Sequence, residues 1–112
     1  MTDAIQVVTT VERREDAERL VQAVITQRLA ACAQVLGPMQ STYWWQGKVE
    51  TATEYLIIFK SRTELYPALE AAIKAAHPYQ VPEILAVPVV AGNPDYLAWL
   101  RAETRAAGAQ TA

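Results

Sequence analysis

The chain of 112 residues contains only one cysteine, one histidine and four glycines. A single cysteine, Cys32, cannot form a disulfide within the chain. A free cysteine is typical of a reducing compartment, so we expect a cytoplasmic protein. The four glycines are scattered along the chain, so no glycine-rich loop is present to cradle a phosphate group. No nucleophile-elbow motif accompanies the histidine, and we therefore expect a protein that is not an enzyme.

The chain also has no excess of positively charged residues. Ten lysines and arginines face twelve aspartates and glutamates, and the net charge of −2 argues against a nucleic-acid partner. The apolar runs are far shorter than the roughly 20 residues that cross a bilayer. Residues 1–4 have neither the basic region nor the apolar stretch of a secretion signal. We expect no membrane association.

Half of the residues are hydrophobic (52%) and a fifth are charged (20%), which is the balance of a soluble globular protein. A chain of this length can bury a core without disulfides or structural metals. We therefore expect one domain over residues 1–112, with an alanine-rich tail at residues 106–112 that frays.

The hydrophobic pattern changes period several times along the chain, and each period indicates a helix or a strand. It predicts strands at residues 5–9, 32–36, 41–45, 48–59 and 84–90, and helices starting near residues 14, 63 and 94. Ser61 or Thr63 is the expected cap of the second helix, and Asn93 that of the third. The order predicts an α+β, ferredoxin-like β-α-β-β-α-β sandwich with an antiparallel sheet and an added C-terminal helix.

Residues 41–59 are expected to form a long hairpin around a tight turn at Gln46-Gly47. Its apolar run at residues 55–59 predicts a central strand that is covered on both faces. Pro88 cannot donate to a ladder, so the last strand should lie at an edge. Trp44 and Trp45 point to opposite faces of a strand, and one of them would lie in water in a monomer. This pattern favours a subunit interface at the hairpin.

The linker at residues 76–84 connects the second helix to the last strand. Pro78 and Pro82 make it stiff and extended, and it carries His77, Tyr79 and Glu83. Such a segment can hold a preorganised site, or it can simply be a connector in which His77 caps the last helix carbonyls. Glu83 requires a partner such as Lys60, Arg28 or an ion, or else solvent.

The candidate metal ligands are His77, Cys32 and Glu83, because copper and zinc favour imidazole and thiolate. One chain cannot close a site of four nitrogen and sulfur ligands. Three chains could share a site, or one histidine with carboxylates could hold an ion loosely. The structural alternative for Cys32 is a small buried apolar residue, and for Tyr43 and Trp45 it is packing in the core or between subunits.

Several segments in this order resemble the CutA family of divalent-cation tolerance proteins over nearly the whole chain. They are Arg28-Leu29-Ala30-Ala31-Cys32, Tyr43-x-Trp45-x-Gly47-Lys48, Lys60-Ser61, His77-Pro78-Tyr79-x-Val81-Pro82-Glu83-Ile84 and Gly92-Asn93-Pro94-x-Tyr96-Leu97-x-Trp99-Leu100. The resemblance implies a tight homotrimer similar to PII signalling proteins, in which the hairpin joins sheets between subunits. It also implies a role linked to copper and other divalent ions, with no obligatory cofactor.

The chain departs from some relatives at two positions. Val8 and Ala76 stand where those relatives carry a cysteine and a second histidine, so a copper site built from those ligands is excluded. The alternative function is a PII-like regulatory trimer that binds a small anionic ligand in the cleft between subunits. The residues expected at that cleft are Arg28, Tyr43, Trp45, Lys48, Lys60 and Tyr79.

Overall fold

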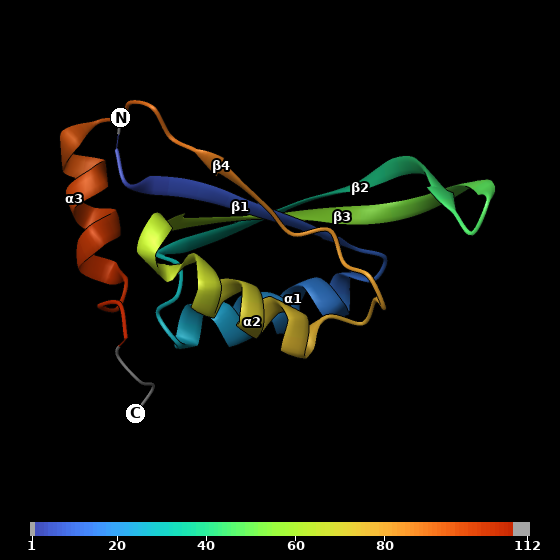
Figure 1. Ribbon diagram of the computed structural model, residues 1–112, viewed down its shortest axis with the longest axis horizontal. Coiled ribbons are helices and arrows are strands. Elements are labelled where there is room, and N and C mark those ends of the chain that lie inside the picture. The colour runs from blue at the N-terminus through green and yellow to red at the C-terminus, as the bar shows by residue number, and fades with distance from the viewer. Residues whose placement is uncertain (1, 109–112) are drawn as a thin grey trace.

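A computed structural model describes residues 2–108, which form a four-stranded antiparallel sheet with two of the three α-helices packed on one face and the third at one end (Figure 1). The strands lie in the order β2-β3-β1-β4. Their bounds are β1 (Ala4–Val11), β2 (Cys32–Trp45), β3 (Lys48–Arg62) and β4 (Leu85–Pro88). The helices are α1 (Arg14–Thr26), α2 (Tyr66–Ala76) after a short 3₁₀ turn η1 (Thr63–Leu65), and α3 (Pro94–Glu103). The predicted α+β, ferredoxin-like arrangement is confirmed. Of the expected frayed tail, residues 109–112 lie outside the described residues.

The core lies between one face of the sheet and the two helices α1 and α2. Alternate residues of β1 and β3 point into it, and the paired residues Val7 and Phe59 are fully buried. Both helices contribute a stripe at helical spacing, made of Ala17, Leu20 and Val24 in α1 and Leu69 and Ile73 in α2. Each large side chain buried in this way contributes about 1.5–3 kcal/mol to folding. The first two helices predicted from the hydrophobic period are therefore confirmed.

The end of α1, which no glycine marks, is formed by Arg28 in the left-handed conformation, with a φ of 56°. The Arg28 N–H donates to the Ile25 carbonyl at 3.0 Å, and the Leu29 N–H donates to the Val24 carbonyl at 3.2 Å. These two bonds close a Schellman motif and satisfy carbonyls at the helix end. The helix therefore ends at Thr26.

The expected caps have different outcomes. The Asn93 side chain accepts a hydrogen bond from the Asp95 N–H at 2.8 Å and caps α3 as predicted. The prediction for α2 is wrong, because neither Ser61 nor Thr63 caps that helix. Ser61 Oγ instead donates to the Leu29 carbonyl at 2.6 Å, and Thr63 Oγ1 donates to the Asp3 carbonyl at 3.1 Å. The Ser61 hydroxyl thus connects β3 to the segment after α1, the Thr63 hydroxyl connects η1 to the start of the chain, and η1 provides the entry to α2.

The hairpin of β2 and β3 turns at Gln46 and Gly47, whose φ values are 50° and 78°. Two positive φ values indicate a two-residue I′ turn, which matches the twist of the strands, and the expected tight turn is confirmed. The two strands predicted at residues 32–36 and 41–45 form one continuous strand, with a bulge between Leu36 and Met39. The far part of this hairpin extends beyond the helices (Figure 1).

The helices α1 and α2 leave the second face of the sheet uncovered, and α3 lies at one end of the sheet, where Arg62 on this face donates to the Thr104 hydroxyl (Figure 1). On this face the apolar side chains of Leu36, Leu85 and Val87 are exposed, with Val8 and Ile58 half-buried beside them. β3 lies in the middle of the sheet as predicted, but the chain itself covers only one of its faces. β4 lies at an edge, as Pro88 indicates, and is only four residues long. We name the uncovered apolar surface the open face.

The bulge at Gly37 generates a test of the fold. Gly37 has a φ of +146°, and a Cβ there would lie 2.9 Å from Tyr55 Cδ1 and 3.0 Å from the Glu54 carbonyl oxygen. We expect Gly37→Ala to destabilise the protein by about 2–3 kcal/mol, because backbone strain and a clash add together. Gly47→Ala is the matched control, since nothing lies within 4 Å of its Cβ position. Gly47→Ala should lower the free energy of unfolding by about 1 kcal/mol. If urea denaturation gave the same loss of unfolding free energy for both variants, the predicted clash at Gly37 would be contradicted.

Candidate functional site

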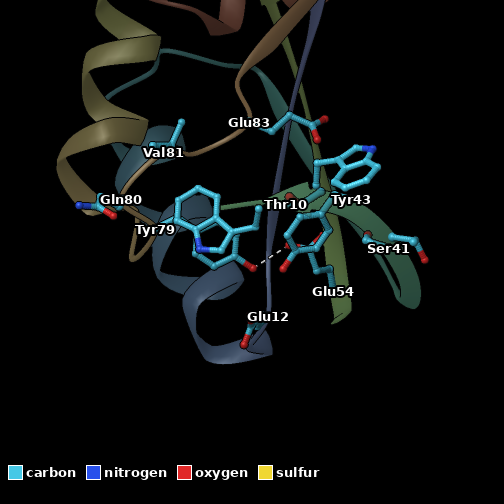
Figure 2. A pocket seen from close by; sticks show the side chains of 12 residues that line it. Thr10, Glu12, Ser41, Tyr43, Glu54, Tyr79, Gln80, Val81 and Glu83 are labelled. Atoms are coloured by element: carbon cyan, nitrogen blue, oxygen red, sulfur yellow. Dashed lines mark hydrogen bonds between the residues drawn. The ribbon is translucent and has the colours of Figure 1, made fainter. Parts of the chain in front are cut away.

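A groove of about 740 Å³ lies where the hairpin leaves the sheet and the linker after α2 returns to it (Figure 2). Four segments line it: the end of β1, the outer part of β2, one residue of β3, and the linker. The lining residues are Thr10, Glu12, Ser41, Thr42, Tyr43, Trp44, Trp45, Glu54, Tyr79, Gln80, Val81 and Glu83. The sheet thus supplies the floor of the groove, and the stiff linker supplies a wall.

Glu54 is the buried charged residue of the groove, with only 6% of its surface exposed. Its Oε2 accepts a hydrogen bond from the Tyr79 hydroxyl at 2.7 Å (Figure 2). None of the ion pairs found among residues 2–108 includes Glu54. Burying a carboxylate without a cationic partner is costly, and one neutral hydroxyl offsets only part of that cost. Glu54 is therefore the group in the groove with the strongest demand for positive charge.

Tyr79 keeps its proton in this setting. Burial and the hydrogen bond to Glu54 raise the pKa of the Tyr79 hydroxyl far above its usual range. The hydroxyl therefore donates to Glu54 and does not compete with it as an anion.

His77 lies behind Tyr79, between the linker and β1. Its Nδ1 accepts the Tyr79 N–H at 3.1 Å, so the proton of the neutral ring lies on Nε2. Nε2 donates to the Thr10 carbonyl at 3.0 Å and lies 3.1 Å from the Thr9 hydroxyl. Burial lowers the pKa of His77, while the Thr10 carbonyl, Asp16 and Glu54 act in the opposite direction. The ring does not cap the last carbonyl of α2, which accepts a bond from Arg19.

The three residues expected as metal ligands are not gathered within one chain. Cys32 starts β2 and pairs with Lys60, which pairs with Gln6, whereas His77 binds Thr9 and Thr10 further along β1. Cys32 and His77 are thus separated by three residues along the strands, about 10 Å, and by two strand spacings, a similar distance across the sheet. They are too far apart to bind the same metal ion within one chain. Glu83 lines the groove and is exposed. Among residues 2–108, no three histidine, cysteine, aspartate or glutamate side chains could together hold a metal ion.

The residues expected at a ligand cleft are divided between different parts of the fold. Tyr43, Trp45 and Tyr79 line the groove. Arg28 Nη1 pairs with Glu103 Oε2 at 3.1 Å near the end of α3, and Lys60 Nζ donates to Gln34 Oε1 at 3.0 Å. Lys48 starts β3 at the hairpin turn. The proposed partners of Glu83, Lys60 and Arg28, are thus bound elsewhere.

The charge of the groove follows from its lining. Three glutamates line it, Glu12, Glu54 and Glu83, and none of its lining residues in the described chain is a lysine or arginine. A cleft with one sign of charge concentrates ions of the opposite sign. The lining therefore favours a cation over an anion.

Sequence reasoning missed Glu54. The sequence signal that could have revealed it is the alternate spacing of Glu54, Leu56 and Ile58. This spacing places the Glu54 carboxylate on the same face of β3 as two apolar residues. Its burial depends on Tyr79, which lies 25 positions away in sequence.

Comparisons with known proteins agree with this fold. The family profile of the CutA1 divalent ion tolerance protein matches residues 5–103. A chloroplastic CutA 1 of Oryza sativa subsp. japonica is 44% identical over 102 residues, which are 91% of this chain but only 58% of the rice protein. The divalent-cation tolerance protein CutA of Thermus thermophilus is 43% identical over 98 residues, covering 88% of this chain and 95% of that one.

A solved structure of the divalent cation tolerance protein from Thermus thermophilus superposes with a TM-score of 0.89 and 41% identity, covering 91% of this chain and 99% of the other. The matches in sequence and structure thus extend over almost all of the sheet and helices described above. They confirm the resemblance found in the sequence motifs. The chain belongs to the CutA1 family of divalent ion tolerance proteins.

Proposed function

We propose that this protein binds divalent cations in the groove and thereby takes part in tolerance to divalent ions. The observation that supports this proposal is the buried Glu54 carboxylate, which has a neutral hydroxyl as its partner and, within residues 2–108, no ion pair with a cationic side chain. A divalent cation beside Glu54 would offset the cost of burying its charge. The name of the Thermus thermophilus relative, a divalent-cation tolerance protein, supports the same class of ligand.

The chemistry of the lining suggests how such an ion is held. Since no three ligating side chains meet within residues 2–108, the ion retains water molecules or gains ligands from a second copy of the chain. Carboxylate and hydroxyl oxygens suit hard cations and do not select copper by softness. Copper(II) still binds oxygen and nitrogen sites more strongly than the other divalent first-row metals. We therefore propose copper(II) as the tightest-binding ion of a site that also accepts others.

We further propose that the protein is a homotrimer, as the family resemblance implies. The open face and the hairpin support this proposal, because they leave apolar side chains in water. Leu85 is 58% exposed on the open face, and Trp44 is 75% exposed near the hairpin turn. Exposed apolar surface of this extent marks an interaction site. Other copies of the chain would cover it and would place their own side chains near the groove.

The proposed role is binding and not catalysis, and the proposed location is the cytoplasm. The support for this location is Cys32, which is a free thiol. The rice relative is named as chloroplastic and that of Archaeoglobus fulgidus as periplasmic, so family members are assigned to more than one compartment. Among the described residues, no helix combines the length and the apolar character that crossing a bilayer requires.

Glu54→Gln tests the proposed cation site. The substitution removes the charge and keeps both the shape and an acceptor for the Tyr79 hydroxyl. We expect the affinity for copper(II) and manganese(II) to fall at least tenfold in calorimetry, because an adjacent charge contributes several kcal/mol to the attraction at partly buried sites. Glu70→Gln is the control, since Glu70 also accepts from a tyrosine hydroxyl, that of Tyr66, but lies outside the groove. Equal affinities in Glu54→Gln and the unmodified protein would contradict the proposal.

Leu85→Glu tests the proposed assembly. A glutamate at this position places a charge on the open face, on the edge strand β4 beside Val8. We expect the trimer to dissociate at low micromolar concentration, because the buried charge would lack a partner. Ala71→Glu places the same charge on the exposed side of α2 and should leave assembly unchanged. A fully trimeric Leu85→Glu variant in sedimentation velocity would show that the open face is not the interface.

A further inference from the structure

Three hydrogen bonds in series connect β1 to Glu54 through the linker. The His77 ring is fixed to β1 by the bond from Nε2 to the Thr10 carbonyl. Its Nδ1 accepts the backbone N–H of Tyr79, and the Tyr79 hydroxyl then donates to Glu54 Oε2 (Figure 2). The two rings also contact each other, with centroids 4.8 Å apart. The position of the Tyr79 hydroxyl over Glu54 is therefore set by His77.

Neither ring nitrogen of His77 is available to a metal ion in this arrangement. A metal at Nδ1 would have to displace the Tyr79 N–H, which would then lack an acceptor. A metal at Nε2 would have to replace the proton donated to the Thr10 carbonyl. The Thr9 hydroxyl beside Nε2 belongs to a fully buried residue, so the approach from that side is also restricted.

Pro78 couples the two residues. It stands between His77 and Tyr79, and its ring fixes one backbone dihedral of this short segment. His77 is itself extended, with a φ of −77° and a ψ of 136°, as expected for a residue that precedes proline. Because the segment has few free dihedrals, the Tyr79 backbone stays bonded to His77, and the hydroxyl leaves Glu54 by rotation of the Tyr79 side chain.

We propose that His77 and Tyr79 form a latch over Glu54 and do not supply metal ligands: a cation gains the Glu54 oxygen only when the Tyr79 hydroxyl releases it. This inference rests on the proposed cation site in the groove. The latch keeps the buried carboxylate hydrogen-bonded while no ion is bound, and it sets the affinity of the site. Loosening the latch therefore strengthens cation binding, whereas removing a ligand would weaken it.

Tyr79→Phe separates these two outcomes. It removes the hydroxyl from Glu54 and leaves the aromatic ring in place. We expect the dissociation constant for manganese(II) and copper(II) in calorimetry to fall about tenfold, because a hydrogen bond to a charged group no longer has to be broken. Tyr66→Phe is the matched control, because the Tyr66 hydroxyl donates to Glu70 Oε2 at 2.9 Å outside the groove. It should leave the dissociation constant unchanged.

Two variants at His77 test the other half of the latch. His77→Ala removes the acceptor for the Tyr79 N–H and should tighten cation binding several-fold. His77→Asn supplies an oxygen that can accept the N–H two residues further on, so its affinity should return toward that of the unmodified protein. Circular dichroism spectra of all variants check that the fold is intact.

The outcomes distinguish the latch from the cation site. If Glu54→Gln weakens binding while Tyr79→Phe and His77→Ala tighten it, both proposals are supported. If Glu54→Gln weakens binding and Tyr79→Phe or His77→Ala also weakens it or leaves it unchanged, the latch is overturned and the cation site stands. If Glu54→Gln leaves binding unchanged, the cation site is wrong, and the latch falls with it.

Discussion

The lengths of the helices and strands set the main constraint on this molecule. A helix of 13 residues such as α1 spans about 20 Å, whereas the 15 residues of β3 span about 50 Å. The two helices, which pack on one face, can therefore cover only the part of the sheet nearest to them. The outer hairpin with Tyr43, Trp44 and Trp45 extends beyond them, and the groove forms where the linker after α2 crosses the uncovered sheet. Both the apolar surfaces and the groove follow from this mismatch.

Two charged residues, Arg62 and Glu54, are buried within residues 2–108, and they differ in how fully their charges are compensated by neighbouring groups. Arg62 is almost fully buried, and its guanidinium donates to the Thr104 hydroxyl at 2.9 Å, to the Arg105 carbonyl at 2.7 Å and to Glu64. These bonds fasten the end of α3 to β3. Glu54 is buried to a similar degree but has one hydrogen bond from a neutral hydroxyl and two further glutamates in the same groove. A buried charge with so little compensation reduces stability, and its retention points to a role in binding a cation.

Much of the fold could be predicted because local signals and the hydrophobic period agreed. Asn93, the Gln46-Gly47 turn and Pro88 each specify a local conformation that tertiary contacts do not alter. The cap of α2 was wrong because Ser61 and Thr63 bind distant carbonyls instead. The site was harder to predict because strand register decides it. The sequence could not show that Cys32 and His77 lie three strand residues and two strand spacings apart, nor that Tyr79 closes over Glu54.

The most direct test of this account is anomalous diffraction from crystals of the protein soaked with manganese(II) or copper(II). We expect an anomalous peak within coordination distance of a Glu54 carboxylate oxygen, with the Tyr79 hydroxyl moved away from that oxygen and the His77 ring free of metal. A peak on a His77 nitrogen, with the bond between Tyr79 and Glu54 intact, would contradict the account.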